Sequence, residues 1–248
     1  MDGWNLVVLF AVGSVAGFIN VNAGGGSSLT LPTLIFLGLD GALANGTNRV
    51  AILIQNVLAV ASFRKNKMHA FKTSASLSLL TLPGAVAGAV LAVHISSALF
   101  ERIVGIVLIF IVFSLFVSQT SAAEPQGTKG LRSWLLYPAL GAIGFYGGFL
   151  QIGVGFLFMA ALYHLHRLDL VRVNMHKVFI ILVYTLPALL VFVKTGNVIW
   201  RYGLILGAGS AFGAWWGAHA AVKGGERFIR IILAVAIIIM AAKLLRLF

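Results

Sequence analysis

A stretch of small and polar residues interrupts the first apolar part of the sequence. Residues 20–32 read NVNAGGGSSLTLP, which places two Asn, three consecutive Gly and two Ser between two apolar runs. Each Gly costs about 1 kcal/mol in a helix interior relative to Ala, so the three glycines predict a helix break. Ser27 or Ser28 then offers an N-cap, and Pro32 is tolerated early in a helix. A helix that starts inside a membrane presents free backbone N–H groups and the positive end of its dipole, and such ends bind anions.

A related stretch lies in the second half of the chain. Residues 149–158 read FLQIGVGFLF, and an ungapped offset of 129 residues superimposes them on the first break. Close helix packing is the alternative reason for the glycines. It explains the amides of Asn20, Asn22 and Gln151 poorly, because buried amides need partners. We therefore expect the breaks near 20–32 and 149–158 to converge on one anion site.

Each half continues with a polar cluster that contains one cation. Residues 45–49 read NGTNR at the start of the third apolar segment, and residues 174–177 read NMHK at the equivalent place in the second half. Arg49 and Lys177 lie one residue apart in this register. Each is either an interfacial cation that reaches toward the headgroups or a part of an anion path, and the sequence favours neither.

Polar residues farther along the same segments complete the candidate site. The pairs 55–56 (Gln-Asn) and 184–185 (Tyr-Thr) align in the middle of apolar segments, where polar side chains usually face the protein interior or a pore. The predicted substrate-binding residues are Asn20, Asn22, Gly24, Gly25, Gly26, Ser27, Ser28, Thr47, Asn48, Arg49, Gln55, Gln151, Gly153, Gly155, Asn174, His176, Lys177 and Tyr184.

Acidic residues are few and lie away from the middle of the apolar segments. All six fall at segment ends or in loops, so no carboxylate is predicted for a Na⁺ site or a proton relay, and the site is expected to be net positive. Histidine is the side chain that titrates near neutral pH, and His176 in the polar cluster is the strongest candidate for proton coupling. The absence of Cys excludes disulfides and thiolate metal sites, and no cofactor or metal is expected.

The composition indicates a membrane protein. Of 248 residues, 60% are hydrophobic and 10% are charged, and the mean hydropathy is +1.02, whereas soluble domains have roughly 25% charged residues. The net charge of +12 could suggest nucleic acid. Basic loops on the cytoplasmic side of a membrane explain it better, since no basic stretch exceeds a few residues. The first apolar run lacks a positive n-region and is expected to be retained.

Ten apolar segments must position these residues. They are expected at 4–22, 27–38, 47–63, 73–93, 99–118, 134–150, 155–166, 175–193, 199–220 and 228–245. We therefore predict an all-α polytopic membrane protein with a first transmembrane repeat (1–120), a polar linker (121–133) and a second repeat (134–248). Five segments per half make the repeats inverted, with broken or re-entrant hairpins at the two breaks. The glycine pairs 84/88 and 213/217 are interpreted as helix-packing positions.

Loop charges predict the orientation. With ten crossings, twelve Lys and Arg residues fall on one side and six on the other, so the side with twelve is expected to be cytoplasmic. Both termini are then periplasmic or extracellular. This prediction is unchanged if the first two segments of each half are both re-entrant, because each half then still has an odd number of crossings. It fails if the two segments form one long crossing, since each half would then have four.

Four stretches of this sequence resemble the TauE/SafE family of sulfite exporters, also called the 4-toluene sulfonate uptake permeases. They are GGGSSLTLP (24–32), the Leu-Asp turn (39–40), ANGTNRV (44–50) and its echo VNMHKV (173–178). The resemblance covers essentially the whole chain. It implies two repeats of helices and transport of small sulfur-containing or organic anions across the inner membrane, with sulfite, sulfoacetate and other sulfonates as substrates.

The family pattern matches the first half better than the second. It carries over to Gly24, Gly25, Gly26, Pro32, Thr47, Asn48 and Arg49. In the second half only Lys177 keeps the basic position. Gln151 stands in a stretch without the triple Gly, Ala161 replaces the expected Pro, and residues 175–176 replace a small residue and Thr.

The sequence thus predicts a secondary transporter for a small sulfur-containing or organic anion in the inner membrane. An anion channel of the same architecture is the first alternative, and a membrane-embedded His-dependent enzyme is the second. HExxH and GxSxG motifs are absent, so no enzyme activity is expected. The expected partners are the anionic substrate and the lipid bilayer, without nucleic acid, and a homo-oligomer is left open.

Overall fold

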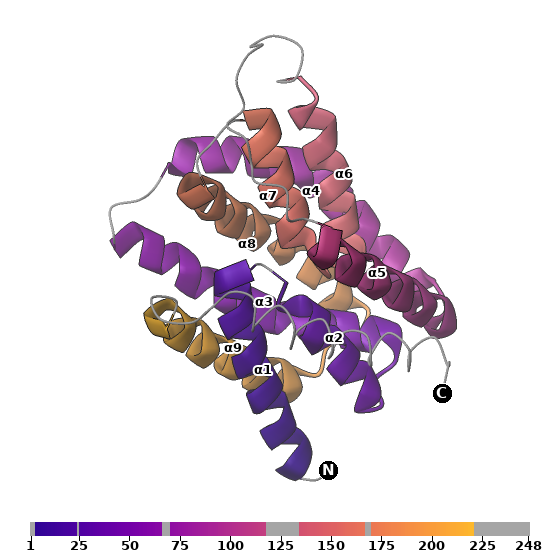
Figure 1. Ribbon diagram of the computed structural model, residues 1–248. Helices are drawn as coiled ribbons and strands as arrows, with labels where there is room; N and C mark the ends of the chain where they lie inside the picture. The colour runs from indigo at the N-terminus through magenta and orange to yellow at the C-terminus, as the bar shows by residue number, and fades with distance from the viewer. Residues whose placement is uncertain (1–2, 24, 66–69, 118–133, 167–169, 221–248) are drawn as a thin grey trace.

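The computed structural model describes residues 3–23, 25–65, 70–117, 134–166 and 170–220, and this part of the chain is all-helical (Figure 1). The described helices are α1 (Gly3–Ala23), α2 (Ser27–Phe36), α3 (Gly41–Lys65), α4 (Phe71–His94), α5 (Ser97–Val117), α6 (Leu136–Phe149), α7 (Val154–His166), α8 (Leu170–Lys194) and α9 (Trp200–Ala220). They match the first nine predicted segments and confirm the all-α class. The predicted tenth segment (228–245) and the polar linker lie outside the described residues.

Helices α3 and α8 begin earlier than predicted. The sequence places their starts at 47 and 175, whereas the helices start at Gly41 and Leu170. The polar residues Asn45, Thr47 and Asn48 therefore lie inside α3, where all three are buried. The first turn of α3 is capped by Asp40, whose Oδ1 accepts a hydrogen bond of 2.9 Å from the N–H of Leu43, and apolar periodicity does not detect such a cap.

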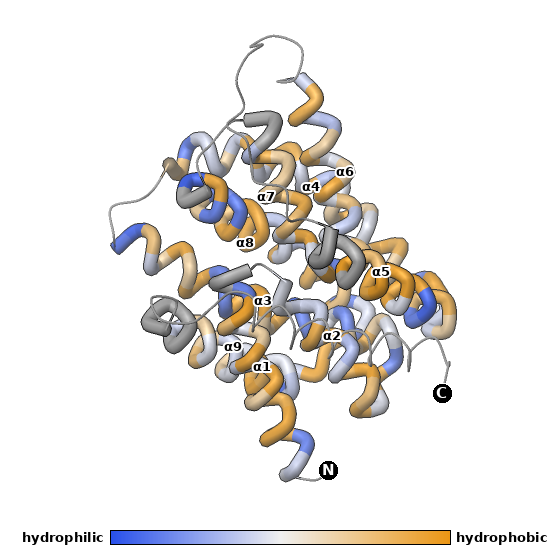
Figure 2. The backbone as a smooth tube through the Cα atoms, in the orientation of Figure 1, coloured by the Kyte–Doolittle hydropathy of each residue, from blue (hydrophilic) through white to orange (hydrophobic). Residues whose placement is uncertain are grey.

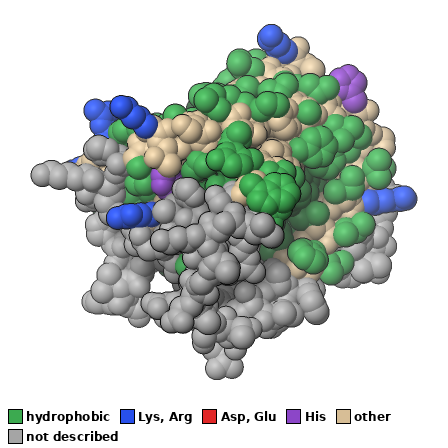
Figure 3. Space-filling view, turned by 90° about the horizontal axis from the view of Figure 1, so that it is seen from above, with side chains coloured by type: hydrophobic (Ala, Val, Ile, Leu, Met, Phe, Trp, Pro, Cys, Tyr) green, Lys and Arg blue, Asp and Glu red, His purple; other side chains and the backbone are tan. Residues whose placement is uncertain are grey.

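The lengths and surface of the helices are those of a membrane protein. Gly3–Asn20, Phe71–His94 and Arg172–Lys194 are long and apolar enough to cross a membrane, whereas Ser27–Phe36 and Val154–Tyr163 are apolar but short. Apolar residues dominate most of the tube in Figure 2. In the described part of the face in Figure 3, many side chains are apolar and the Lys and Arg side chains lie at the periphery, as expected of a surface that contacts lipid.

The two halves of the chain are interleaved through their helix contacts. Helix α1 packs most extensively on α9, and α6 packs most extensively on α4. Helix α3 lies against both α8 and α9, and α8 lies against α4. Each half therefore depends on the other for its packing.

Small residues let these helix pairs approach closely. A Cβ atom at Gly84 would overlap the carbonyl oxygen of Gly141, and one at Gly88 would overlap that of Phe145. A Cβ at Gly213 would overlap the carbonyl oxygen of Ser14. The packing interpretation is confirmed for Gly84, Gly88 and Gly213.

The two chain breaks meet in the middle of the molecule. Helix α1 ends at Ala23 and α2 begins at Ser27, while α6 ends at Phe149 and α7 begins at Val154. In Figure 1 the hairpins α1–α2 and α6–α7 approach the centre from opposite ends. The Ser27 hydroxyl donates a hydrogen bond of 3.3 Å to the carbonyl oxygen of Gln151, which joins the two tips.

The α4–α6 contact yields a testable prediction. Gly144→Ala should destabilise the protein by about 1–3 kcal/mol, because the new Cβ would overlap the carbonyl oxygen of Thr81. Gly141→Ala is the matched control on the same helix, since its Cβ would lie 3.8 Å from Leu80 O. The midpoint of thermal unfolding in detergent is measured for both variants. Equal midpoints for the two would contradict the close approach.

Candidate functional site

Gln151 connects the second break to three other helices. Its φ of 66° is a left-handed conformation that is uncommon for a residue other than glycine. Its backbone oxygen accepts hydrogen bonds from Ser27 Oγ and from the N–H of Val154. Its side-chain Oε1 accepts a bond from Arg49, and its Nε2 donates to Thr185 Oγ1 at 3.4 Å. The amide group thus fixes the tip of the α6–α7 hairpin.

Arg49 forms the strongest contacts of this tip. Its guanidinium has no exposed surface and donates to Gln151 Oε1 at 2.6 Å and to Gly147 O at 3.1 Å. A further short bond goes to Gly148 O, and the guanidinium carbon lies 4.9 Å from the centroid of the Phe192 ring. These carbonyls are at the end of α6, where the helix has no partners for them and its dipole is negative. Arg49 therefore acts as a C-terminal cap for α6.

Other members of the 45–49 cluster also satisfy backbone groups. Asn45 Nδ2 donates to the last carbonyl of α6, Phe149 O, at 2.7 Å. Thr47 Oγ1 accepts a bond of 2.9 Å from the N–H of Ile199, just before α9 begins. The cluster therefore caps one helix end and one helix start in the second half of the chain.

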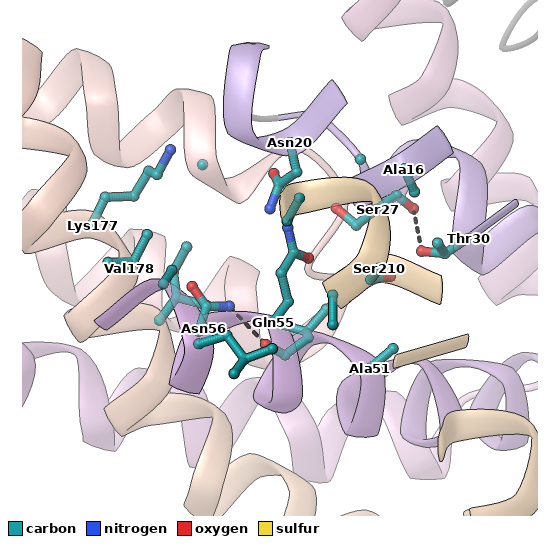
Figure 4. Close-up of a pocket in the computed structure, with 18 of the residues that line it drawn as sticks. Ala16, Asn20, Ser27, Thr30, Ala51, Gln55, Asn56, Lys177, Val178 and Ser210 are labelled. Carbon is teal, nitrogen blue, oxygen red and sulfur yellow. Dashed lines mark hydrogen bonds between the residues drawn. The ribbon is translucent and has the colours of Figure 1, made fainter. Parts of the chain in front are cut away.

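A cavity of about 530 Å³ lies beside the joined tips (Figure 4). Its walls come from α1, α2, α3, α7, α8 and α9, together with the second break. In Figure 4, Asn20 of α1, Lys177 of α8 and the α3 pair Gln55 and Asn56 border this space from different sides. The polar residues that line it are Asn20, Ser27, Thr30, Asn48, Gln55, Asn56, Ser62, Gln151, Asn174, Lys177 and Ser210.

Lys177 is the one charged side chain among the described residues that line this cavity. It is 5% exposed, and its Nζ lies 3.9 Å from Met159 Sδ, which is a weak acceptor. No carboxylate stands among the described lining residues. An ammonium group that is buried without a counter-ion is costly, so the geometry suits an anionic ligand.

Asn48 provides the second indication of a ligand. It has no exposed surface and lines the cavity, and neither Oδ1 nor Nδ2 has a hydrogen-bond partner among the described residues. Buried polar atoms are rarely left unpaired in folded proteins. An oxyanion is one partner that can satisfy such an amide donor.

The start of α2 differs from the predicted N-cap. The cap residue is Gly26, without a side-chain hydrogen bond, so neither serine caps the helix. Ser28 Oγ instead donates to Gly25 O at 2.6 Å, because the tight turn brings that carbonyl close. The N–H groups of Ser28 and Leu29 are bonded to Gly25 O and Gly26 O. Ser27 Oγ, at the cavity wall, is the hydroxyl that this helix start presents.

Half of the predicted site residues line the cavity. They are Asn20, Gly26, Ser27, Asn48, Gln55, Gln151, Gly155, Asn174 and Lys177. Of Asn22 only the backbone is described, and Gly24 lies outside the described residues. The remaining predicted residues, Gly25, Ser28, Thr47, Arg49, Gly153, His176 and Tyr184, are not among the lining residues.

Two of the residues outside the lining have clear surroundings of their own. His176 Nδ1 is 2.8 Å from Ser74 Oγ of α4, in a buried contact. The Tyr184 hydroxyl is buried and has no hydrogen-bond partner among the described residues. It would lie 2.7 Å from a Cβ atom at Gly147, and the Tyr184 ring stacks on Phe158.

Sequence reasoning missed four polar lining residues: Thr30, Asn56, Ser62 and Ser210. Thr30 follows Ser27 by three residues, so helical spacing places both on one face. Asn56 belongs to a polar pair of which only Gln55 was selected. Ser210 of α9 carries no sequence signal, because a lone Ser in an apolar helix is common. The described residues contain no group of three or more metal ligands.

Comparison with known proteins identifies relatives over nearly the whole chain. The family model described as "Sulfite exporter TauE/SafE" matches residues 9–244. "Probable membrane transporter protein YfcA" of Escherichia coli (strain K12) is 29% identical over 242 residues, which cover 97% of this chain and 89% of that protein. "Probable membrane transporter protein ORF9" of Sinorhizobium sp is 28% identical over 240 residues, with 97% and 92% covered. "Probable membrane transporter protein YunE" of Bacillus subtilis (strain 168) is 24% identical over 266 residues, with 97% of each chain covered. No solved structure is significantly similar to this chain.

The capping role of Arg49 is testable by substitution. Arg49→Gln should lower stability by on the order of 3 kcal/mol, because it leaves the buried carbonyls of Gly147 and Gly148 without their donors. Arg49→Lys should lose less, since it keeps the charge but not the two-armed donor. Arg102→Gln, at an exposed position on α5, should change stability by less than about 0.5 kcal/mol. Thermal unfolding in detergent compares the three variants, and an unchanged midpoint for Arg49→Gln would contradict the cap.

Proposed function

The chain belongs to the sulfite exporter TauE/SafE family, a family of membrane transporters rather than enzymes, and on that premise we propose that it is a secondary transporter of a small anion. The proposed substrates are sulfur-containing or organic anions such as sulfite, sulfoacetate or another sulfonate. The protein itself is a multi-pass membrane protein.

The buried ammonium of Lys177 is the observation that carries this proposal. It lines a cavity without described carboxylates, and so does Asn48, whose amide has no described hydrogen-bond partner. An anion supplies the counter-charge for the first group and the hydrogen-bond acceptors for both. Ser27, Asn20 and Asn174 are the proposed further ligands from the cavity wall. Arg49 and Gln151 are proposed as positioning residues, since their side chains bind each other.

Matched contacts in the two halves support an inverted repeat. A Cβ at Gly144 of α6 would overlap Thr81 O of α4, and a Cβ at Gly17 of α1 would overlap Ser210 O of α9. Thr81 and Ser210 are related by the 129-residue offset that relates the halves in the sequence. The same two helix pairs have the most extensive contacts. We therefore propose the domain arrangement of residues 1–120 and 134–248 around a shared central site.

The proposed location is the inner membrane, with both termini periplasmic. Arg49 and Lys177 are buried in the protein and do not belong to loops. When both are left out of the count of loop charges, each side loses one cation, so the side predicted to be cytoplasmic still carries more basic residues. Lys65 at the end of α3 is then cytoplasmic, and Lys194 at the end of α8 is periplasmic.

Anion binding is testable with purified protein. The midpoint of thermal unfolding is measured with each of a set of compounds: sulfite, sulfate, sulfoacetate, taurine, thiosulfate, acetate and phosphate. At least one should raise the midpoint of unfolding. Lys177→Gln should weaken the binding of that anion at least tenfold, because the counter-charge is lost. The midpoint without anion should stay equal or rise, since an unpaired buried charge is removed. Lys194→Gln, which changes an exposed lysine at a helix end, is the control.

Two outcomes of this measurement would contradict the proposal. The first is the absence of a shift with every anion. The second is an unchanged shift in Lys177→Gln. Saturable counterflow in vesicles then distinguishes a carrier from an anion channel of the same architecture.

The inverted repeat and the orientation are testable together. The chain has no Cys, so Lys65→Cys and Lys194→Cys each introduce a single thiol, at positions related by 129 residues. A membrane-impermeant maleimide should label Lys194→Cys in intact cells and Lys65→Cys only after permeabilisation. Labelling of both from the same side would contradict the inverted arrangement.

A further inference from the structure

The cavity offers a ligand a single full positive charge. Lys177 Nζ has Met159 Sδ as its contact at 3.9 Å and faces a wall of neutral amides and hydroxyls. A bound anion brings its first negative charge to this ammonium. A second negative charge on the same ligand finds no further cation among the described lining residues, and an uncompensated charge is costly in a buried site.

Arg49 does not supply the second charge in this arrangement. Its two terminal nitrogens are committed to Gln151 Oε1 and to the carbonyls of Gly147 and Gly148. Arg49 is also absent from the residues that line the cavity.

The helix dipoles at the two breaks add little net charge. At the first break the negative end of α1 at Ala23 is followed within four residues by the positive end of α2 at Ser27. At the second break α6 ends at Phe149 and α7 begins at Val154. Opposite dipole ends this close together largely cancel as charges.

From this charge inventory we propose that the cavity selects singly charged anions and rejects doubly charged anions of the same size. The inference rests on the proposed function and narrows its substrate class. Monoanionic sulfonates and carboxylates satisfy it. For sulfite, the bound species would be hydrogen sulfite, whereas sulfate and the sulfoacetate dianion would be disfavoured.

Two pairs of anions with similar shape and different charge test the selectivity. Methanesulfonate and sulfate form the first pair, and propane-1-sulfonate and sulfoacetate form the second. Apparent dissociation constants are measured from thermal unfolding of the purified full-length protein at pH 8 and constant ionic strength. In each pair that binds, the monoanion should be bound at least tenfold more tightly. Equal or tighter binding of the dianion would overturn the inference.

A second cation in the cavity should reverse the preference. Gln55 lines the cavity on α3, and Gln55→Lys should improve binding of the dianion at least tenfold relative to the monoanion. Gln55→Met, of similar length and without charge, is the control, and it should not reverse the preference for the monoanion. If Gln55→Lys does not fold, the selectivity of the parent protein alone decides. If Gln55→Lys folds and its selectivity is unchanged, the number of positive charges in the cavity does not set the selectivity, and the inference is overturned.

The outcomes separate this inference from the proposed function. Binding of a dianion without discrimination leaves an anion transporter in place and removes only the charge selection. If none of these four anions binds, and none of those compared above for stabilisation binds either, both the proposed anion site and this inference are wrong.

Discussion

A helix that ends in the interior of a protein leaves carbonyl groups without partners, and the bonds that Arg49 makes to the end of α6 meet this constraint. Buried carbonyl groups have no water to bond, so a break at such a place requires protein donors. Arg49 and Asn45 of α3 supply them to Gly147, Gly148 and Phe149. Through Gln151 the same contacts extend to Ser27 and Thr185. The tip of one hairpin, the start of the other and two long helices are thereby held around one cavity.

The two halves use their equivalent cations differently. Arg49 has a planar, two-armed donor group that suits neighbouring carbonyls, and it is bound to the scaffold. Lys177 lies at nearly the same register, and its Nζ faces the cavity with only a weak sulfur acceptor. In the proposed site, one half of the molecule thus provides a fixed frame, and the other provides the charge for the ligand. A single sequence motif that is repeated in both halves therefore does not imply a repeated role.

Much of the fold could be predicted from the sequence, because the signals are local. Apolar runs placed nine described helices, and the glycines of the first break and the Gln-Ile-Gly-Val-Gly stretch located both interruptions. The start of α3 was predicted too late, because Asn45 and Thr47 look like loop residues until their partners on other elements are known. The N-cap was also wrong, because Ser28 has a nearer acceptor in Gly25 O.

The sequence by itself determined the membrane class, the helical segments and the family, since hydropathy, glycine content and motif spacing act over short stretches of chain. Tertiary structure decided which polar residues face the cavity. Arg49 and Gln151 are 102 residues apart, and nothing local to either indicates that they bind each other. Only folding, by bringing the end of α6 against α3, occupies the guanidinium. The ammonium of Lys177 stays available because the described wall of the cavity contains no carboxylate.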